Sequence, residues 1–252
     1  MPRMMTDDSM ETSKIGGGTQ AFQFSGTRVS HLSSTEYTLV TIAVDHTGST
    51  SLFADDLRKT LISAVESCKK SQRSNNLLVR ALIFSSSLRG GIEELHGFKP
   101  LSEINTADYR KFTPNGMTPL NDAVFSSVAA ECAYAKQLID QDFMVNGIFI
   151  VITDGAENAS SSTPAMIKAE MARASKSEEI ESIIGILVGI NANDCRGLLE
   201  KFANEVGMQY LDAGDATPGK LAKLAAFVSQ SVSSQSQSLG TGGPSQQIAA
   251  TI

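Results

Sequence analysis

The hydrophobic residues of this chain follow two patterns that alternate along its length. Continuous apolar runs of strand length occupy residues 38–45, 77–86, 145–154 and 180–190. Between these runs, apolar residues recur every three or four positions, as on the buried face of a helix, most clearly over residues 120–139. Strands that are apolar throughout and separated by helices predict a parallel sheet covered by helices on both faces.

Weaker patterns add further elements. The stretch "GIEELHGF" predicts a short strand reached through a tight "RGG" turn, and two Thr-Pro pairs mark helix starts. The predicted helices are 53–68, 102–112, from 163 onward, 198–206 and 217–232, and the last short strand is 208–213. One α/β domain spanning residues 37–234 accounts for all of them.

The two ends of the chain differ from this domain. Both are rich in Ser, Gln and Gly and poor in large apolar residues, so burial cannot offset the entropy of ordering them. We expect residues 1–36 to form a flexible arm, in which residues 21–30 offer one extra strand, and residues 235–252 to form a flexible tail.

Composition narrows the classes of function. The chain has 252 residues, 41% of them hydrophobic, and a net charge of -6 with its basic residues scattered, so no nucleic-acid footprint is visible. Cys68, Cys132 and Cys195 lie far apart and match neither a disulfide framework nor a zinc site. No secretory signal or run of about 18 apolar residues is present, so we expect a cytoplasmic protein with no membrane partner.

Polar residues gather where predicted strands end. Asp45 ends a strand in "AVDHTGS", Asp154 ends another in "VITDGAEN", and Thr118 precedes a helix in "NGMTPLND". Parallel strands bring their carboxyl ends to one edge of the sheet, and the Asp-x-Thr-x-Ser spacing directs Asp45, Thr47 and Ser49 to one side. Carboxylates and hydroxyls are hard oxygen donors, which suit a small divalent cation such as Mg²⁺.

These three motifs, in this order, resemble the metal-ion-dependent adhesion site (MIDAS) of von Willebrand factor type A (vWA) domains. That family has Asp-x-Ser-x-Ser after the first strand, a Thr before a central helix and Asp-Gly after the fourth strand. Thr47 stands where the family usually has Ser and keeps the hydroxyl. The resemblance implies a three-layer, Rossmann-like fold whose mostly parallel sheet has one antiparallel edge strand, here "GIEELHGF".

The resemblance also implies a function. Asp45, Thr47, Ser49, Thr118 and Asp154 would hold Mg²⁺, with Mn²⁺ or Ca²⁺ as alternatives, and an Asp or Glu of another protein would complete the coordination. The chain would then be a non-enzymatic protein-protein interaction module of an intracellular multiprotein assembly. Family members switch affinity by moving their last helix, here around residues 221–232.

Other readings of the same residues remain open. A strand-end Asp often caps a loop, and "DG" often forms a turn. Two aspartates with Mg²⁺ also suit a metal-assisted phosphohydrolase, although we find no nucleophile or base for it. A third reading is a structural or assembly protein with a vestigial site. The chain lacks a phosphate loop, a Gly-x-Ser-x-Gly elbow and a Rossmann glycine fingerprint.

Several polar neighbours of these motifs have simpler roles. His46 alternates with Thr47 in the strand-end pattern and so faces away from the hydroxyls, which favours a rim or packing role over general-base chemistry. Helix capping or water bridging is expected, before direct metal ligation, for Asn121, Asp122, Glu157 and Asn158.

Overall fold

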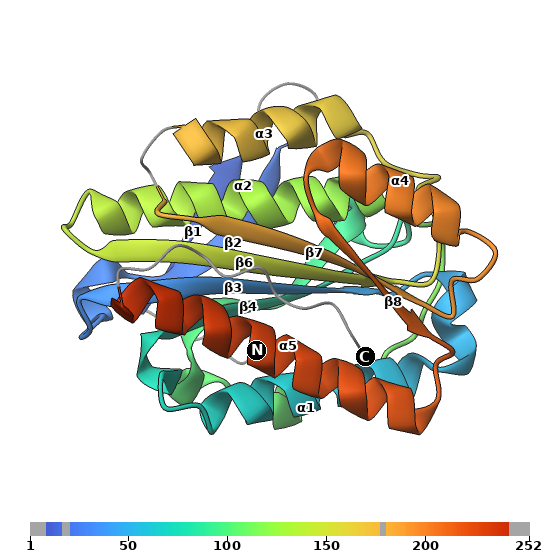
Figure 1. The fold of residues 1–252 in the computed structure, drawn as a ribbon, viewed down its shortest axis with the longest axis horizontal. Coiled ribbons are helices and arrows are strands. Elements are labelled where there is room, and N and C mark those ends of the chain that lie inside the picture. The colour runs from blue at the N-terminus through green and yellow to red at the C-terminus, as the bar shows by residue number, and fades with distance from the viewer. Residues whose placement is uncertain (1–8, 17–20, 177–179, 242–252) are drawn as a thin grey trace, which may run out of the picture.

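The computed structural model describes residues 9–16, 21–176 and 180–241, and within these ranges it contains eight strands and five α-helices (Figure 1). The strands are β1 (Met10–Ile15), β2 (Phe22–Thr27), β3 (Glu36–Asp45), β4 (Leu77–Phe84), β5 (Ile92–Pro100), β6 (Met144–Thr153), β7 (Ile183–Ile190) and β8 (Gln209–Gly214). The helices are α1 (Ala54–Lys69), α2 (Leu120–Ile139), α3 (Pro164–Lys176), α4 (Arg196–Val206) and α5 (Pro218–Thr241).

All eight strands join one sheet in the order β1-β2-β5-β4-β3-β6-β7-β8. The run from β4 through β3, β6 and β7 to β8 is parallel, with Val44 of β3 opposite Ile152 of β6. The predicted α/β architecture with a mostly parallel sheet is therefore confirmed. Because β3 and β6 are central neighbours, their carboxyl ends lie side by side.

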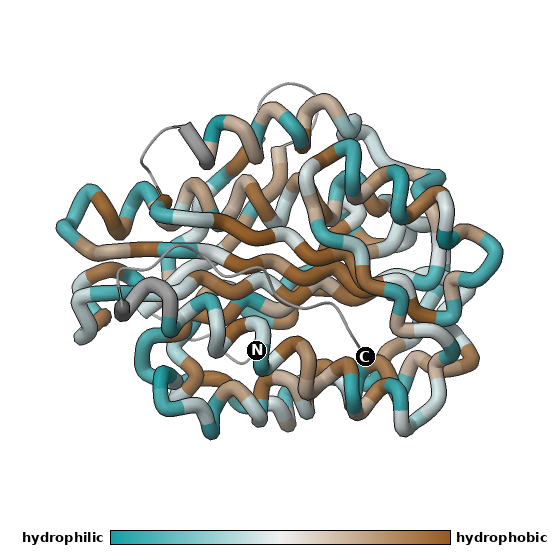
Figure 2. Tube along the Cα trace, viewed as in Figure 1, coloured by the Kyte–Doolittle hydropathy of each residue, from teal (hydrophilic) through white to brown (hydrophobic). Residues whose placement is uncertain are grey.

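Helices cover both faces of the sheet, as the apolar pattern predicted. The helices α2, α3 and α4 lie on one face, and α1 and α5 lie on the other (Figure 1). Side chains of β3 alternate between the two cores, since Leu39 packs on the α2 side and Val40 on the α1 side. Figure 2 shows the strands as a hydrophobic band between helices with hydrophilic outer surfaces.

The position of the antiparallel strand corrects one expectation. The "GIEELHGF" segment forms β5 and runs antiparallel to β4, as expected, but it is not at the edge of the sheet. The edge is formed by an antiparallel hairpin of β1 and β2, in which β2 adds to β5 in parallel. Residues 1–36 were expected to form a flexible arm with one extra strand, and their described part contains two strands, β1 and β2. Residues 1–8 and 17–20 of this arm lie outside the described ranges.

Buried polar and aromatic contacts fix this hairpin. Arg80 of β4 is fully buried and donates from Nε to Oε1 of Glu94 on β5 at 2.6 Å. The Glu94 carboxylate in turn accepts from the backbone N and the Oγ of Ser25 on β2, at 3.1 and 2.7 Å to Oε2. The ring of Phe24 on β2 meets Tyr134 of α2 edge-on at a centroid distance of 6.2 Å. The hairpin therefore shares the core beneath α2.

The segment after β5 is not the predicted helix. It forms two short 3₁₀ turns, Leu101–Glu103 and Thr106–Asp108, joined by extended backbone. The side chain of Asn105 accepts from the backbone N of Ala107 and caps the second turn. The apolar spacing that resembled a helix instead serves burial against α1, through Leu101, Ile104, Tyr109 and Phe112.

The last helix is longer than expected. It runs to Thr241, seven residues into the expected tail, and residues 242–252 of that tail lie outside the described ranges. Gln235 explains the difference, because its carbonyl accepts from Nδ2 of Asn146 at 2.7 Å and its Nε2 donates to Oγ of Ser182 at 2.9 Å. Hydrogen bonds thus replace apolar burial here. Neither α5 nor any other described helix is long and apolar enough to cross a bilayer.

Candidate metal centre

The predicted site lies where β3 and β6 end. Asp45 is the last residue of β3, and Asp154 follows the last residue of β6. Asp45 is fully buried, and its Oδ2 accepts a hydrogen bond of 2.6 Å from Oγ1 of Thr153. Parallel pairing of the two strands therefore places both predicted carboxylates in one loop cluster, beside the 3₁₀ turn Gly48–Leu52 at the right of Figure 1.

A continuous series of hydrogen bonds joins four of the five predicted residues. Oδ1 of Asp45 accepts from the backbone N of Thr47 at 2.8 Å. Oγ1 of Thr47 and Oγ of Ser49 are 3.0 Å apart, and Oγ of Ser49 donates to Oδ1 of Asp154 at 2.7 Å. Asp45, Thr47 and Ser49 thus lie together as expected, although Ser49 belongs to the 3₁₀ turn Gly48–Leu52 and not to the extended backbone that the spacing argument assumed.

Thr118 reaches the same cluster from a third loop. A Cβ built on Gly155 would lie 3.3 Å from Oγ1 of Thr118, so that hydroxyl borders the residue next to Asp154. Two hydrogen bonds to Asn158 hold the backbone of Thr118. The backbone N of Thr118 donates to Oδ1 of Asn158 at 2.7 Å, and the carbonyl of Thr118 accepts from the backbone N of Asn158 at 3.1 Å. The structure therefore brings all five predicted residues to one end of the sheet.

Neither carboxylate has a positive neighbour among the described residues. Burial raises the pKa of the Asp45 carboxyl to about 6, although hydrogen bonds from Thr153 and Thr47 oppose the rise. Burial also raises the pKa of Asp154, and the hydrogen bond from Ser49 opposes it. Within residues 9–16, 21–176 and 180–241, no Lys or Arg pairs with either carboxylate.

This donor set fits a hard divalent cation. Two desolvated carboxylates beside three hydroxyls need a counter-charge, and oxygen donors are the ligands that Mg²⁺, Mn²⁺ and Ca²⁺ prefer. The described part of the chain holds no group of three His, Cys, Asp or Glu side chains placed for metal binding. Hydroxyls and water would therefore have to supply the remaining ligands.

The other polar residues around the site hold its loops. Oε2 of Glu157 accepts from the backbone N of Asn121 at 2.7 Å, in the first turn of α2. The two carboxylate oxygens of Asp122 accept from the backbone N of Ser162 and Ser161, at 2.8 and 3.1 Å. Glu157 therefore caps the first turn of α2, whereas Asp122 and Asn158 hold neighbouring loops through their backbone amides.

His46 has a role that the sequence reading did not specify. Its Nε2 accepts from the backbone N of Thr113 at 2.9 Å, and its carbonyl accepts from the backbone N of Asn115 at 3.1 Å. Its ring meets Phe112 edge-on at 5.5 Å. His46 thus packs, as expected, and it also holds the loop that leads to Thr118.

Thr153 was missed from the sequence. Its hydroxyl donates to Asp45 and its Oγ1 accepts from the backbone N of Gly155 at 3.2 Å, so it links the two strand ends. The only available signal was its place before Asp154 in "VITDG", at the end of a predicted strand. Pairing order within the sheet was needed to use that signal.

Comparisons with known proteins support the fold. The sequence matches no protein-family model and no curated protein. Among solved structures, it is similar to the pilus adhesin SpaC of Lactobacillus rhamnosus GG, with a TM-score of 0.58 and 13% identity over 90% of this chain and 34% of that one. The PilB minor pilin of Streptococcus sanguinis matches with a TM-score of 0.57 and 14% identity, over 91% of this chain and 68% of that one.

A third likeness concerns a metal-bound protein. Proximal thread matrix protein 1 from the mussel byssus, solved with a zinc-occupied MIDAS motif, matches with a TM-score of 0.52 and 14% identity over 79% of this chain. This chain spans about a third of SpaC and about half of the mussel protein, at 34% and 46% of their lengths. At such identities these likenesses establish the α/β fold that the sheet topology already shows.

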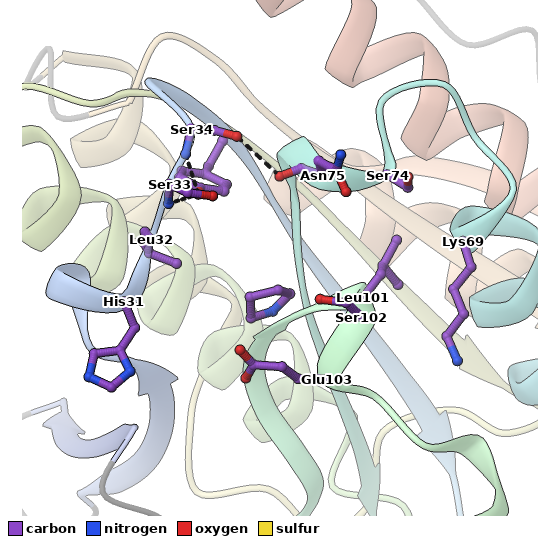
Figure 3. A pocket seen from close by; sticks show the side chains of 12 residues that line it. His31, Leu32, Ser33, Ser34, Lys69, Ser74, Asn75, Leu101, Ser102 and Glu103 are labelled. Atoms are coloured by element: carbon purple, nitrogen blue, oxygen red, sulfur yellow. Dashed lines mark hydrogen bonds between the residues drawn. The ribbon is translucent and has the colours of Figure 1, made fainter.

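A groove of about 630 Å³ lies away from this site. It is lined mainly by residues at the amino end of β3, in the turn before β4 and in the turn after β5 (Figure 3). There the hydroxyl of Tyr37 accepts from the backbone N of Ser33 and Ser34, at 3.0 and 2.9 Å. None of the five predicted metal ligands lines it. The candidate metal centre is instead a surface site, since Ser49 is exposed.

Proposed function

We propose that this chain is a vWA-type module that binds another protein through a divalent cation held by Asp45, Thr47, Ser49, Thr118 and Asp154. One observation carries the proposal. Two desolvated carboxylates and three hydroxyls converge at the carboxyl end of the sheet, and no described cationic side chain pairs with the carboxylates. A bound cation would supply the missing charge.

The chemistry of the site supports recognition of a carboxylate. When bound, Mg²⁺ supplies a positive centre with coordination positions left for an incoming oxygen ligand. Asp45 and Asp154 supply the negative charge that holds the ion, and the hydroxyls of Thr47, Ser49 and Thr118 supply neutral oxygen ligands. The mussel protein with zinc in its MIDAS motif supports a metal role for such a site. Magnesium is our choice because every donor is oxygen, with Mn²⁺ or Ca²⁺ as alternatives.

The geometry around His46 supports a non-enzymatic role. A general base needs a free lone pair, but Nε2 of His46 already accepts from the backbone of Thr113, and its Nδ1 is buried. The site is also a surface rather than a deep pocket, which suits a macromolecular partner better than a small substrate. Turnover of a generic phosphate ester with Mg²⁺ or Mn²⁺, lost in Asp154→Ala, would contradict this part of the proposal.

The cellular setting is part of the same proposal. Cys68 and Cys132 are buried, Cys195 is partly buried, and none of the three forms a disulfide, a usage that suits a reducing compartment. We therefore propose an intracellular multiprotein assembly as the setting. Fractionation of the native host cells, with the protein recovered outside the cytoplasm, would contradict it.

Metal-dependent stabilisation tests the proposal. Thermal unfolding is measured with Mg²⁺, with Mn²⁺ and with chelator, and the metals are expected to raise the melting temperature by several degrees at millimolar concentration. The double variant Asp45→Ala with Thr118→Ala should lose this shift. The matched control is Asp140→Ala, an exposed carboxylate at the end of α2, which should retain it. No shift in the parent protein would refute metal binding.

A further inference from the structure

The chain contains two Asn-Gly pairs, which the fold places in different surroundings. Asn115 and Gly116 are exposed in the loop before α2, whereas Asn146 and Gly147 are buried in the central strand β6. An asparagine before a glycine is prone to attack on its side-chain amide by the next backbone nitrogen, because glycine has no side chain to obstruct the approach. Two pairs of the same sequence thus show what the fold itself contributes to this reaction.

At the exposed pair, the two groups that would react lie together. The backbone N of Gly116 donates to Oδ1 of Asn115 at 2.8 Å, so the side-chain amide lies against the nitrogen that follows it in the chain. Within the part of the chain that the structure describes, this backbone N donates to no backbone carbonyl. Backbone pairing therefore does not hold the nitrogen away from the side chain of Asn115.

Hydrogen bonds on both sides fix this arrangement. The backbone N of Asn115 donates to the carbonyl of His46 at 3.1 Å. The carbonyl of Gly116 accepts from the backbone N of Gly48, also at 3.1 Å. Gly116 has a φ of +79°, and a Cβ built on it would lie 2.8 Å from Oγ of Ser85, so the loop requires glycine here. The loop thus holds the nitrogen and the amide in one orientation, which lowers the entropy cost of bringing them together.

The buried pair has the opposite arrangement. The backbone N of Gly147 donates to the carbonyl of Ser182 at 2.8 Å, so backbone pairing holds this nitrogen. Nδ2 of Asn146 donates to the carbonyl of Gln235 at 2.7 Å, and Asn146 is only 1% exposed. Attack at this pair would break both hydrogen bonds inside the core, where water has no access to complete the reaction.

We propose that Asn115 is a site of spontaneous deamidation in the folded protein and that Asn146 is not. The backbone N of Gly116 loses its proton and bonds to Cγ of Asn115, and the bond from Cγ to the side-chain nitrogen breaks. That nitrogen leaves as ammonia, and a cyclic succinimide remains. Water then opens the ring at one of its two carbonyl carbons. Opening at Cγ gives Asp, and opening at the backbone carbonyl carbon gives isoaspartate, in which the main chain runs through the side-chain carbons.

The reaction would change the loop that leads to Thr118. Both products carry a new carboxylate at position 115. Isoaspartate also lengthens the main chain by one methylene, which displaces the carbonyl of Gly116 from the backbone N of Gly48 and loosens the turn that contains Ser49. This consequence for the metal centre rests on the proposed function, whereas the reaction itself does not.

Mass spectrometry tests the reaction. The full chain is incubated at mildly alkaline pH in heavy-oxygen water, once folded and once in urea, and is then digested in ordinary water so that later deamidation carries no label. In the folded protein, the peptide that contains Asn115 should take up heavy oxygen and the peptide that contains Asn146 should not. In urea, both peptides should take it up, because the fold no longer protects Asn146.

A matched variant and two results decide the proposal. Asn115→Gln should remove the label at this position, because its longer side chain would have to form a larger ring. An absence of label at Asn115 in the folded protein would overturn the proposal, since the loop would then protect the amide. Equal labelling of Asn115 and Asn146 in the folded protein would also overturn it, since the sequence alone would then decide.

Thermal unfolding of the separated products tests the consequence. The isoaspartate form, identified by methylation with an isoaspartyl methyltransferase, should show a smaller Mg²⁺-dependent shift in melting temperature than fresh protein. Asn115→Asp keeps the normal main chain and should retain the full shift. A full shift in the isoaspartate form, or an equal loss in Asn115→Asp, would overturn the main-chain argument. No shift in fresh protein would instead refute the proposed function and leave the labelling result unaffected.

Discussion

Two acidic centres in the same sheet differ in their counter-charge. At the hairpin, the carboxylate of Glu94 faces Arg80, whose side chain is fully buried, and the pair closes a gap between β4, β5 and β2. At the carboxyl end, Asp45 and Asp154 lie together with no described cationic partner. The fold therefore supplies a cationic side chain for Glu94. At Asp45 and Asp154, the proposed metal ion would supply the charge instead.

Removing Arg80 should have the largest effect on stability. Arg80→Met leaves the partly buried Glu94 carboxylate without its cation, and unpairing a buried charge costs about 3 kcal/mol or more. Urea unfolding of the parent and the variant measures the loss. Lys59→Met, which removes an exposed pair with Asp55, should cause no measurable loss. Equal stabilities for parent and Arg80→Met would show that Glu94 does not depend on its partner.

Asp45 should make the protein less stable as the pH rises, whereas a carboxylate with a cationic partner makes a protein more stable as the pH rises. The folded pKa of Asp45 is raised to about 6, so the folded state holds a proton that the unfolded state releases near pH 4. The contribution of Asp45 is complete below pH 4 and is lost as the pH rises through 6. In chelator, stability should therefore fall by roughly 2–3 kcal/mol over this range.

Matched variants and metal separate the sources of this pH dependence. Asp45→Asn should remove the part of the fall that Asp45 contributes, and Mg²⁺ should offset that part in the parent because the ion favours the charged carboxylate. Burial also raises the pKa of Asp154, and that of Glu131 well above its usual range, so Asp154→Asn and Glu131→Gln should each reduce the fall that remains. Urea unfolding from pH 4 to 8 measures each profile. A parent profile in chelator that rises with pH would contradict the unpaired state of Asp45.

The smallest effect is expected at His46. His46→Leu removes the acceptor for the backbone N of Thr113 and loosens the loop that leads to Thr118. Losing one such hydrogen bond, about 1 kcal/mol, should weaken Mn²⁺ binding about fivefold in calorimetric titration. His31→Leu, an exposed histidine before β3, is the matched control. Lower stability with unchanged Mn²⁺ affinity would mean that His46 serves packing alone.

Much of the central fold could be predicted because its signals are local. The strands β3, β6 and β7 are apolar on both faces, and α2 repeats its apolar residues over five turns. The apolar composition of the strands and the helical spacing in α2 are therefore enough to predict these elements. Asp45 and Asp154 were placed together because strand ends in a parallel sheet share an edge. Thr47 and Ser49 followed from their spacing after Asp45, and Thr118 from its loop in the motif order that resembles the vWA family.

The remainder depends on contacts between distant residues. β1 reads "METSKI", with little apolar character, and it forms because β2 beside it is held by Arg80 and Glu94. The end of α5 is rich in Ser and Gln, and Gln235 is ordered by Asn146, about 90 positions away in the chain. The link from Thr153 to Asp45 likewise joins residues 108 positions apart. Local patterns do not contain these pairings.

The first turn of α2 has a further consequence for how the site opens. Pro119 precedes the helix and provides no side-chain cap, so the loop after β6 provides one instead, through Glu157 to the amide of Asn121 and Ser160 to that of Asp122. Movement of this loop would break the hydrogen bonds to those two amides and would displace Asp154 at the same time. The loop and the helix start therefore form one cooperative unit of local unfolding, and amide hydrogen exchange at α2 would follow the opening of the metal centre.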